Sequence, residues 1–450
     1  MEKTSIHGMW SSRLAFILAA TGSAVGLGNI WRFPYLVSDN GGGAFVLVYM
    51  GCIFLVGLPV LIAEILLGRH GRRSPVNTLL DLARETGAAK AWAGIGWIGI
   101  IAGVLILSFY SVVGGWTLHY AWLYLMQLFG GAPIDDPAAA FSALLADPLE
   151  LTFWHAAFML LTVGVVALGV EKGLERAVSF LMPALFLMLL LLVGYGATTG
   201  HLGQAAAFLF QPDWSKVNGG VFVAALGQAF FTLSLGMCTM MTYGAYLPKD
   251  VSIPKTGAVV AVADTGVALL AGLAIFPIVI AFGIDPAGGG PGLIFTSLPL
   301  AFNAMSMGVI YGLLFFGLLF VAAWTSSISL LEPATAYLVE RGRTSRRTAA
   351  LSMAALCWVL GLASVLSLNV LSDVRIFDRD IMGFIELVAS EIMLPLGGLL
   401  IALFAGWALK ESVLREQLKG LSPALFTLWR WLVRVVAPLL VLAVLLNVLF

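Results

Sequence analysis

The stretch GSAVGLGNIWRFP, residues 22–34, lies inside an apolar segment, residues 10–37, that is long enough to cross a lipid bilayer. It contains three glycines together with Asn29 and Arg32, in a place where a spanning helix is expected to be continuous. A helix interrupted in the middle of a membrane leaves backbone N–H and C=O groups without partners. We therefore expect the interruption to serve a function, and the rest of the sequence indicates which one.

The composition predicts an integral membrane protein. Of the 450 residues, 60% are hydrophobic and only 11% are charged. The mean hydropathy of +0.99 is well above that of water-soluble domains. The 24 basic and 24 acidic residues balance, so nothing favours a nucleic-acid partner. Cys52, Cys238 and Cys357 have no metal-ligand spacing and predict neither a zinc site nor a disulfide framework.

Runs of about 20 apolar residues predict about eleven spanning helices in the lipid bilayer. They lie near residues 11–37, 42–68, 89–127, 152–170, 174–198, 217–246, 254–284, 306–339, 347–369, 381–409 and 425–450. Residues 212–214 and 286–295 are expected as outer loops that hold short helices. The polar N-terminus precedes an apolar run too long for a signal peptide, which predicts a first spanning helix and no cleaved leader.

The loop charges predict the orientation. The segments after the second, eighth and tenth spans are rich in Arg and Lys, whereas the loop after the third span carries only acidic charges. By the positive-inside rule, the N-terminus is cytoplasmic and the C-terminus periplasmic or extracellular. We expect a multi-pass protein of a bacterial cytoplasmic (inner) membrane.

The sequence predicts a single transmembrane domain, residues 1–450, that is built from two repeats. The sixth span contains Ser234-Leu235-Gly236 near its middle, five spans after the first interruption. Matching interruptions of this kind predict an inverted repeat, with one copy at about 11–198 and the other at about 215–410, followed by an extra helix at about 425–450.

Broken helices of this type can bind ions and polar ligands. Unwound backbone offers carbonyl oxygens to a cation, and the N-terminus of a half-helix offers N–H groups to an anion. The alternative is that the glycines only allow helices to pack closely. Close packing explains spaced glycines but does not explain Asn29 and Arg32 in the same segment.

Three motifs carry a resemblance to a known family. They are GSAVGLGNIWRFPYLVSDNGGGAFVLVY at 22–49, GQAFFTLSLG at 227–236 and TSSISLLEP at 325–333. In this order they resemble the neurotransmitter:sodium symporter family, particularly its bacterial amino-acid transporters. The resemblance covers nearly the whole chain and implies an all-α, leucine-transporter-like fold with a 5+5 inverted repeat and broken helices 1 and 6. The family's model has twelve spans, and the helix missing here lies outside the repeats.

The resemblance implies two bound sodium ions and no organic cofactor. The first ion would be held by Ala24, Asn29, Thr232 and, on the seventh helix, Asp264. The second would be held by the carbonyls of Gly22, Val25 and Ala322 and the hydroxyls of Thr325 and Ser326. These ligands are hard oxygens, which suit a hard cation. Taken alone, Thr-Ser-Ser in a membrane helix is more often a packing feature.

Asp264 departs from the family pattern, which has Asn at this position. One turn on, where relatives have Glu or Ser, stands Ala268. An ionisable group at membrane depth indicates a functional site. We expect Asp264 to supply the negative charge that chloride supplies in other members, so that transport is chloride-independent. The alternatives are that it carries a proton or serves as a protonated hydrogen-bond donor.

The resemblance also implies a neutral, mainly hydrophobic amino acid as substrate. Gly26 stands where amine transporters have Asp, and this leaves room for a substrate carboxylate. The residues expected around the substrate are Ala24, Gly26, Leu27, Gly28, Ile106, Tyr110, Phe231, Thr232, Ser234, Met237, Ser327 and Leu330. Those around the side chain are mostly apolar, and Ser23 replaces an Asn of the leucine transporter.

Alternating access needs a gate on each side of the site. By resemblance, Arg32 would pair with Glu386 on the outside. Trp10, Tyr246 and Glu340 would form the inner gate, where His7 replaces the family's Arg and weakens the expected charge pair. Lys3 or Arg13 is a candidate substitute. Glu64, Glu332 and Glu391 are further carboxylates in helical segments, to which the sequence assigns no role.

These observations favour a sodium-coupled amino-acid symporter. A proton-coupled or exchange-type transporter of the same fold, or an amino-acid sensor or channel, stays open. An enzyme is not expected, because no nucleophile–base pair, metal cluster or phosphate loop is found. The expected partners are a small amino acid and the bilayer, and the sequence leaves open whether the protein forms a homodimer.

Overall fold

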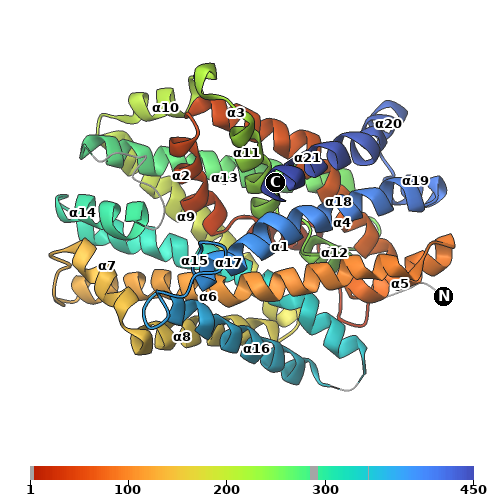
Figure 1. Ribbon diagram of the computed structural model, residues 1–450, viewed down its shortest axis with the longest axis horizontal. Coiled ribbons are helices and arrows are strands. Elements are labelled where there is room, and N and C mark those ends of the chain that lie inside the picture. Colours follow the sequence, from red (N-terminus) through yellow and green to blue (C-terminus); the bar gives the residue numbers. More distant parts are fainter. Residues whose placement is uncertain (1–4, 284–291, 343, 450) are drawn as a thin grey trace.

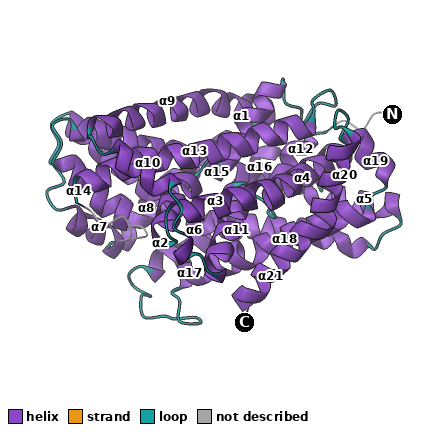
Figure 2. Ribbon diagram, turned by 90° about the horizontal axis from the view of Figure 1, so that it is seen from above, coloured by secondary structure: helices purple, strands orange, loops and turns teal. Residues whose placement is uncertain are grey.

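The computed structural model describes residues 5–283, 292–342 and 344–449. Most of the loop expected at 286–295 therefore lies outside the described residues, as does Lys3. Every element named in the described part of the chain is helical, as the sequence predicts for an all-α membrane protein. Figures 1 and 2 show the long helices running roughly along one axis.

The first half of the chain contains nine α-helices. They are α1 (Arg13–Ala24), α2 (Phe33–Asp39), α3 (Gly43–Cys52), α4 (Leu58–Gly71), α5 (Pro75–Thr86), α6 (Gly94–Leu128), α7 (Pro137–Ala146), α8 (Pro148–Val166) and α9 (Arg176–Thr198). The second half contains α10 (Leu202–Phe210), α11 (Gly219–Thr232), α12 (Thr239–Ala245), α13 (Ile253–Ala281), α14 (Leu298–Asn303), α15 (Gly308–Glu340), α16 (Arg346–Ser367), α17 (Ile381–Glu386), α18 (Leu394–Leu403), α19 (Glu411–Gln417), α20 (Pro423–Trp431) and α21 (Ala437–Leu449).

Short π or 3₁₀ turns join or continue these helices. They are η1 (Gly28–Arg32), η2 (Ile53–Gly57), η3 (Lys90–Ala93), η4 (Val170–Glu175), η5 (Trp214–Lys216), η7 (Leu293–Ser297), η8 (Leu387–Met393), η9 (Phe404–Ala408) and η10 (Leu432–Val436). The turns η5 and η7 lie in the two segments where the sequence predicts short helices in outer loops.

In the described residues, nine helices are long and apolar enough to cross a membrane, and the bent pair around residues 24–28 makes a tenth. The expected span at 217–246 is divided into α11 and α12, each too short to cross alone. Counting this divided segment as one span gives the eleven that the sequence predicts.

The first break bends the chain by 51° between α1 and the helix that begins at Gly28. Ser12 caps the start of α1 by accepting a hydrogen bond from the Ala15 amide. The helix ends at Ala24 because Val25 adopts an extended conformation. The chain becomes helical again within a few residues, so the unwound part is short.

The second break, between α11 and α12, depends on left-handed residues. Ser234, Gly236 and Cys238 all have positive φ, which turns the chain sharply. At Gly236 a β-carbon would lie 2.1 Å from the Leu394 carbonyl oxygen, so only glycine fits. The backbone N–H of Gly236 donates a hydrogen bond to the Glu64 carboxylate at 2.7 Å. This contact gives the buried Glu64 a structural role.

The short helices gather at the two ends of the long ones (Figures 1 and 2). Helices α7, α10 and α14 lie at one end, and α5, α19 and α20 lie at the other, together with the N-terminus. Each break lies near the middle of its span, far from either end of that span. The unwound backbone is therefore in the interior of the bundle.

We predict that Gly236→Ala lowers the stability of the protein by about 2–4 kcal/mol, because the new methyl group combines left-handed strain with a steric overlap. The expected result is a clear fall in the melting temperature of the detergent-solubilised protein. Gly266→Ala on α13 is the matched control, since nothing lies within 4 Å of the added carbon. Equal melting temperatures for the two variants would contradict the assignment.

Candidate functional site

The two breaks face each other across a narrow cavity with a volume of about 20 Å³. The segments that line it come from α1, α6, α11 and α15 and from both breaks. The lining residues are Ser23, Ala24, Gly26, Gly28, Ile106, Tyr110, Phe231, Thr232, Ser234, Met237, Ser326 and Leu330. Ten of the twelve residues expected around a substrate are in this set.

The other two expected substrate residues lie nearby but not in the lining of this cavity. Leu27 directs its backbone N–H to the Tyr110 hydroxyl at 3.3 Å, so its polar group is close to the cavity. Ser327 instead hydrogen-bonds to Thr162 on α8 at 2.7 Å, on another face of α15. Ser326, which the sequence assigns to a sodium site, also lines the cavity.

The backbone groups freed by the first break find side-chain partners. The Asn29 side-chain oxygen accepts from the Gly26 amide at 3.0 Å, and Gln228 donates to the Gly28 carbonyl at 2.8 Å. At Gly26 itself, a β-carbon would lie 2.5 Å from the Ser326 hydroxyl oxygen. These contacts explain Asn29 and Gly26 in the opening motif.

Asp264 is the centre of a buried polar cluster. Its carboxylate accepts hydrogen bonds from the Asn29 amide at 2.8 Å and from the Thr232 hydroxyl at 2.9 Å. All three side chains are at most 1% exposed. Within the described residues, no Lys, Arg or His forms an ion pair with Asp264. A buried carboxylate without a basic partner favours a bound cation.

A second set of oxygens converges on the other side of the first break. The Ser326 hydroxyl lies 3.5 Å from the Gly22 carbonyl and 3.3 Å from the Val25 carbonyl. Thr325, the preceding residue, has its hydroxyl 3.1 Å from the Ala322 carbonyl. A β-carbon on Gly22 would lie 3.5 Å from the Thr325 β-carbon, which places this part of α15 against the first break. The five residues that the resemblance implies for the second sodium ion thus lie close together.

The expected outer ion pair is not formed in this structure. Arg32 and Glu386 line a common cavity of about 340 Å³ with Tyr110 and Phe231, yet no ion pair joins the two side chains. The Arg32 guanidinium instead lies over the Phe231 ring, 5.0 Å from its centre. A cavity thus separates Arg32 from Glu386, and the predicted pair would need these residues to approach each other.

The inner side is closed. Trp10 is buried, and its backbone N–H and indole N–H donate to the carbonyls of Tyr246 and Tyr243, each at 3.0 Å. Tyr246 donates to Glu332 at 2.7 Å, and Glu332 in turn pairs with Arg346 at 2.5 Å. These contacts close the inner end beneath the two breaks.

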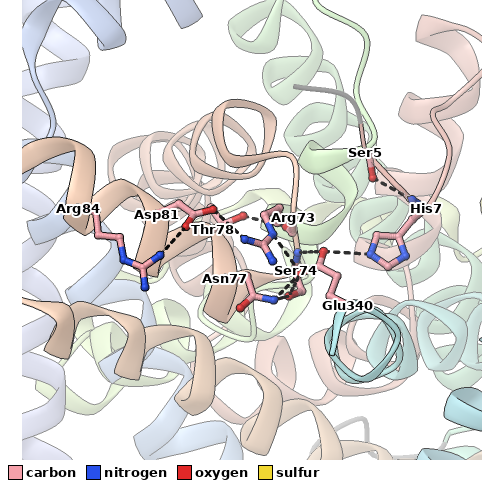
Figure 3. A network of polar contacts seen from close by, with 9 residues as sticks. All are labelled: Ser5, His7, Arg73, Ser74, Asn77, Thr78, Asp81, Arg84 and Glu340. Carbon is pink, nitrogen blue, oxygen red and sulfur yellow. Dashed lines mark hydrogen bonds and ion pairs between the residues drawn. The ribbon is translucent and has the colours of Figure 1, made fainter. Parts of the chain in front are cut away.

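Glu340 is the remaining inner-gate residue that the sequence identifies. His7 lies 3.0 Å from it, as the sequence comparison with the family suggests (Figure 3). Ser74 and Asn77 also bind Glu340, and the sequence gives no indication of either. Glu391 is half-buried in η8, and its place in the structure assigns it no function.

The fold and the two broken spans are those of a secondary transporter. The family model described as "Sodium:neurotransmitter symporter family" matches residues 7–129 and 142–450. The chain belongs to this family. It is therefore a multi-pass, sodium-dependent membrane transporter and not an enzyme.

Similar proteins agree with this assignment. A chain described as "Uncharacterized sodium-dependent transporter YhdH" from Bacillus subtilis is 38% identical over 97% of both chains. An uncharacterized sodium-dependent transporter from Haemophilus influenzae is 34% identical over 98% of both. The crystal structure of MhsT in complex with L-phenylalanine matches with a TM-score of 0.91 and 44% identity, covering 98% of this chain and 99% of MhsT.

We predict that Ser326→Ala weakens sodium binding about tenfold, because the cation loses a converging oxygen, at a cost of about 1–2 kcal/mol. The adjacent Ser327→Ala is the matched control and is expected to leave sodium affinity unchanged, since its hydroxyl faces α8. Thermal stabilisation as a function of sodium concentration measures both. Equal losses in the two variants would mean that the converging oxygens do not bind sodium.

Proposed function

We propose that the protein is a sodium-coupled symporter that imports neutral, mainly hydrophobic amino acids by alternating access. The observation that carries this proposal is the Asp264 cluster. A buried carboxylate is held by Asn29 and by Thr232, and Thr232 lines the cavity between the two unwound segments. A sodium ion beside Asp264 and a zwitterion in the cavity would satisfy the groups that both breaks leave open.

The cavity supports an amino acid as the substrate. A substrate carboxylate would bind the N–H groups of Leu27 and Gly28 and the Tyr110 hydroxyl. The ammonium group would bind the carbonyls of Ala24, Phe231 and Thr232 and the Ser234 hydroxyl. The absence of a side chain at Gly26 supports this arrangement, because a β-carbon would collide with Ser326 and would come within 3.0 Å of the Tyr110 hydroxyl.

The walls of the cavity support a hydrophobic side chain. Ile106, Phe231, Met237 and Leu330 contribute apolar surface, and no charged residue is in the lining. The similarity to MhsT, whose structure contains L-phenylalanine, supports the same substrate class. Met237 is flexible and would accommodate side chains of several shapes.

Two sodium ions would bind, one at Asp264 and one at the oxygens near Ser326. Because the first ion would share its coordination shell with the substrate carboxylate, each would raise the affinity of the other. The sodium gradient would then drive import. The arginine-rich α5 region lies at the same end as the N-terminus, which supports a cytoplasmic N-terminus in a bacterial inner membrane.

The proposal is tested with proteoliposomes that carry either a sodium gradient or a proton gradient. We expect concentrative uptake of L-phenylalanine only with inward-directed sodium, and competition by leucine and methionine but not by lysine or glutamate. Uptake driven by a proton gradient alone would favour the alternative in which Asp264 carries a proton. Equilibration without accumulation under both gradients would indicate a channel or sensor.

We predict that wild-type transport is independent of chloride, because Asp264 supplies a fixed negative charge next to the first sodium ion. Asp264→Asn removes this charge and keeps the side-chain volume, so uptake is expected to fall at least about tenfold in chloride-free buffer, with partial recovery in chloride. Sodium-driven uptake in chloride and in gluconate measures the effect. A wild-type protein that needs chloride would contradict the prediction.

A further inference from the structure

Glu340, the last residue of α15, is held mainly by the beginning of α5 (Figure 3). Its side chain is only 2% exposed. The carboxylate accepts from the Ser74 backbone N–H at 2.5 Å, the Ser74 hydroxyl at 2.6 Å and the Asn77 amide at 2.6 Å. The Arg73 guanidinium lies 3.7 Å away. We call Arg73, Ser74 and Asn77 the α5 clasp.

The N-terminal segment contributes one contact to the same carboxylate. His7 lies 3.0 Å from Glu340 and must donate from Nε2, because a carboxylate only accepts. A neutral imidazole can make this hydrogen bond, so the contact requires no positive charge at position 7. Arg13 forms no ion pair in the described part of the chain.

The positive charge that faces Glu340 comes from Arg73, which shares it between Glu340 and a second carboxylate. Arg73 also pairs with Asp81 at 3.0 Å, and Asp81 is bound to Arg84 at 3.3 Å. These charges are partly exposed and are screened by water. Ser74 is buried and Asn77 is partly buried. Their hydrogen bonds to Glu340 are short and go to a charged group, and we therefore expect them to contribute more than the ion pair.

The clasp connects α15 to a second unit, which is formed by α4 and α12. These two units must separate when the inner gate opens. Helix α4, which precedes α5, packs closely on α12, so that a β-carbon on Gly68 would lie 1.8 Å from the Met241 carbonyl oxygen. At the end of α4, Arg72 donates to the carbonyls of Ala245 and Leu247. The inner half of the sixth span is thus tied to α4, and the clasp joins this unit to α15.

We propose that the α5 clasp is the principal lock of the inner gate, in which Ser74 and Asn77 hold Glu340 while the transporter is closed to the cytoplasm and His7 is an accessory donor. The proposal rests on the proposed function, because a lock of this kind acts only in a carrier that alternates between two open sides. Opening requires α12 to leave α15, and this movement breaks the bonds of the clasp.

The test measures how fast the inner side opens. A cysteine is introduced by Ala19→Cys, at a fully buried position of α1, and its reaction with a membrane-impermeant thiol reagent is followed in inside-out vesicles. The protein without this substitution reports the reaction of the three native cysteines. The readout needs neither substrate nor transport, so it remains valid if the proposed amino-acid substrate is wrong.

We expect Ser74→Ala/Asn77→Ala to react about tenfold faster than the parent, because two hydrogen bonds to a buried carboxylate are lost. His7→Ala is expected to change the rate less than about threefold. Thr86→Ala, at the end of the same helix, is the matched control, since its hydroxyl bonds only to carbonyls of its own helix. Its rate should equal that of the parent.

A charge exchange distinguishes a broken lock from a misfolded protein. Asn77→Asp places a second carboxylate against Glu340 and should accelerate the reaction, whereas Asn77→Asp/Glu340→Gln restores a donor–acceptor pair and should return the rate to within about threefold of the parent. The proposal is overturned if the double alanine variant reacts like Thr86→Ala, if His7→Ala has the larger effect, or if the exchange does not restore the slow rate.

Discussion

The structure depends on one constraint, which is that every backbone polar group inside a membrane must have a partner. The chain breaks two spanning helices and satisfies several of the freed groups with dedicated side chains. Asn29 accepts from the Gly26 amide, Gln228 donates to the Gly28 carbonyl, and Glu64 accepts from the Gly236 amide. These buried residues keep the unwound segments in place. Residues of both breaks line a common cavity, where the proposed function places a cation and a zwitterion.

The buried polar cluster around Asp264 explains how the binding of a cation could be linked to the movement of the broken spans. Asp264 connects the first break, through Asn29, to the end of α11, through Thr232. A cation at this junction would therefore stabilise the arrangement of both broken spans at once. In the present structure the inner end is closed by the contacts of Trp10, Glu332 and Glu340, while Arg32 and Glu386 remain apart at the outer end.

Much of this could be predicted from the sequence, and the exceptions have physical reasons. The breaks, Asn29 and the ionisable Asp264 follow from the motifs, because membrane spans tolerate few glycines and charges without cause. The support that Gln228 and Glu64 give to the breaks could not be predicted, since only the fold brings them to the Gly28 carbonyl and the Gly236 amide. The orientation of Ser327 could not be predicted, since consecutive residues of a helix point in directions about 100° apart and several faces of α15 are buried. Ser74 and Asn77 were also not predictable, because polar residues at the start of a surface helix are common and only the fold brings them to Glu340. The Arg32–Glu386 pair depends on the conformational state, which a sequence does not specify.

The central claim is that two unwound segments form one cage for an alkali cation and an amino acid together. The most direct test is the dissociation constant of L-phenylalanine for the purified protein, measured as sodium replaces potassium at constant ionic strength. The account predicts that the amino acid binds progressively more tightly as sodium rises, and that saturating L-phenylalanine raises the sodium affinity by the same factor. An amino-acid affinity that is equal in sodium and in potassium would contradict the account.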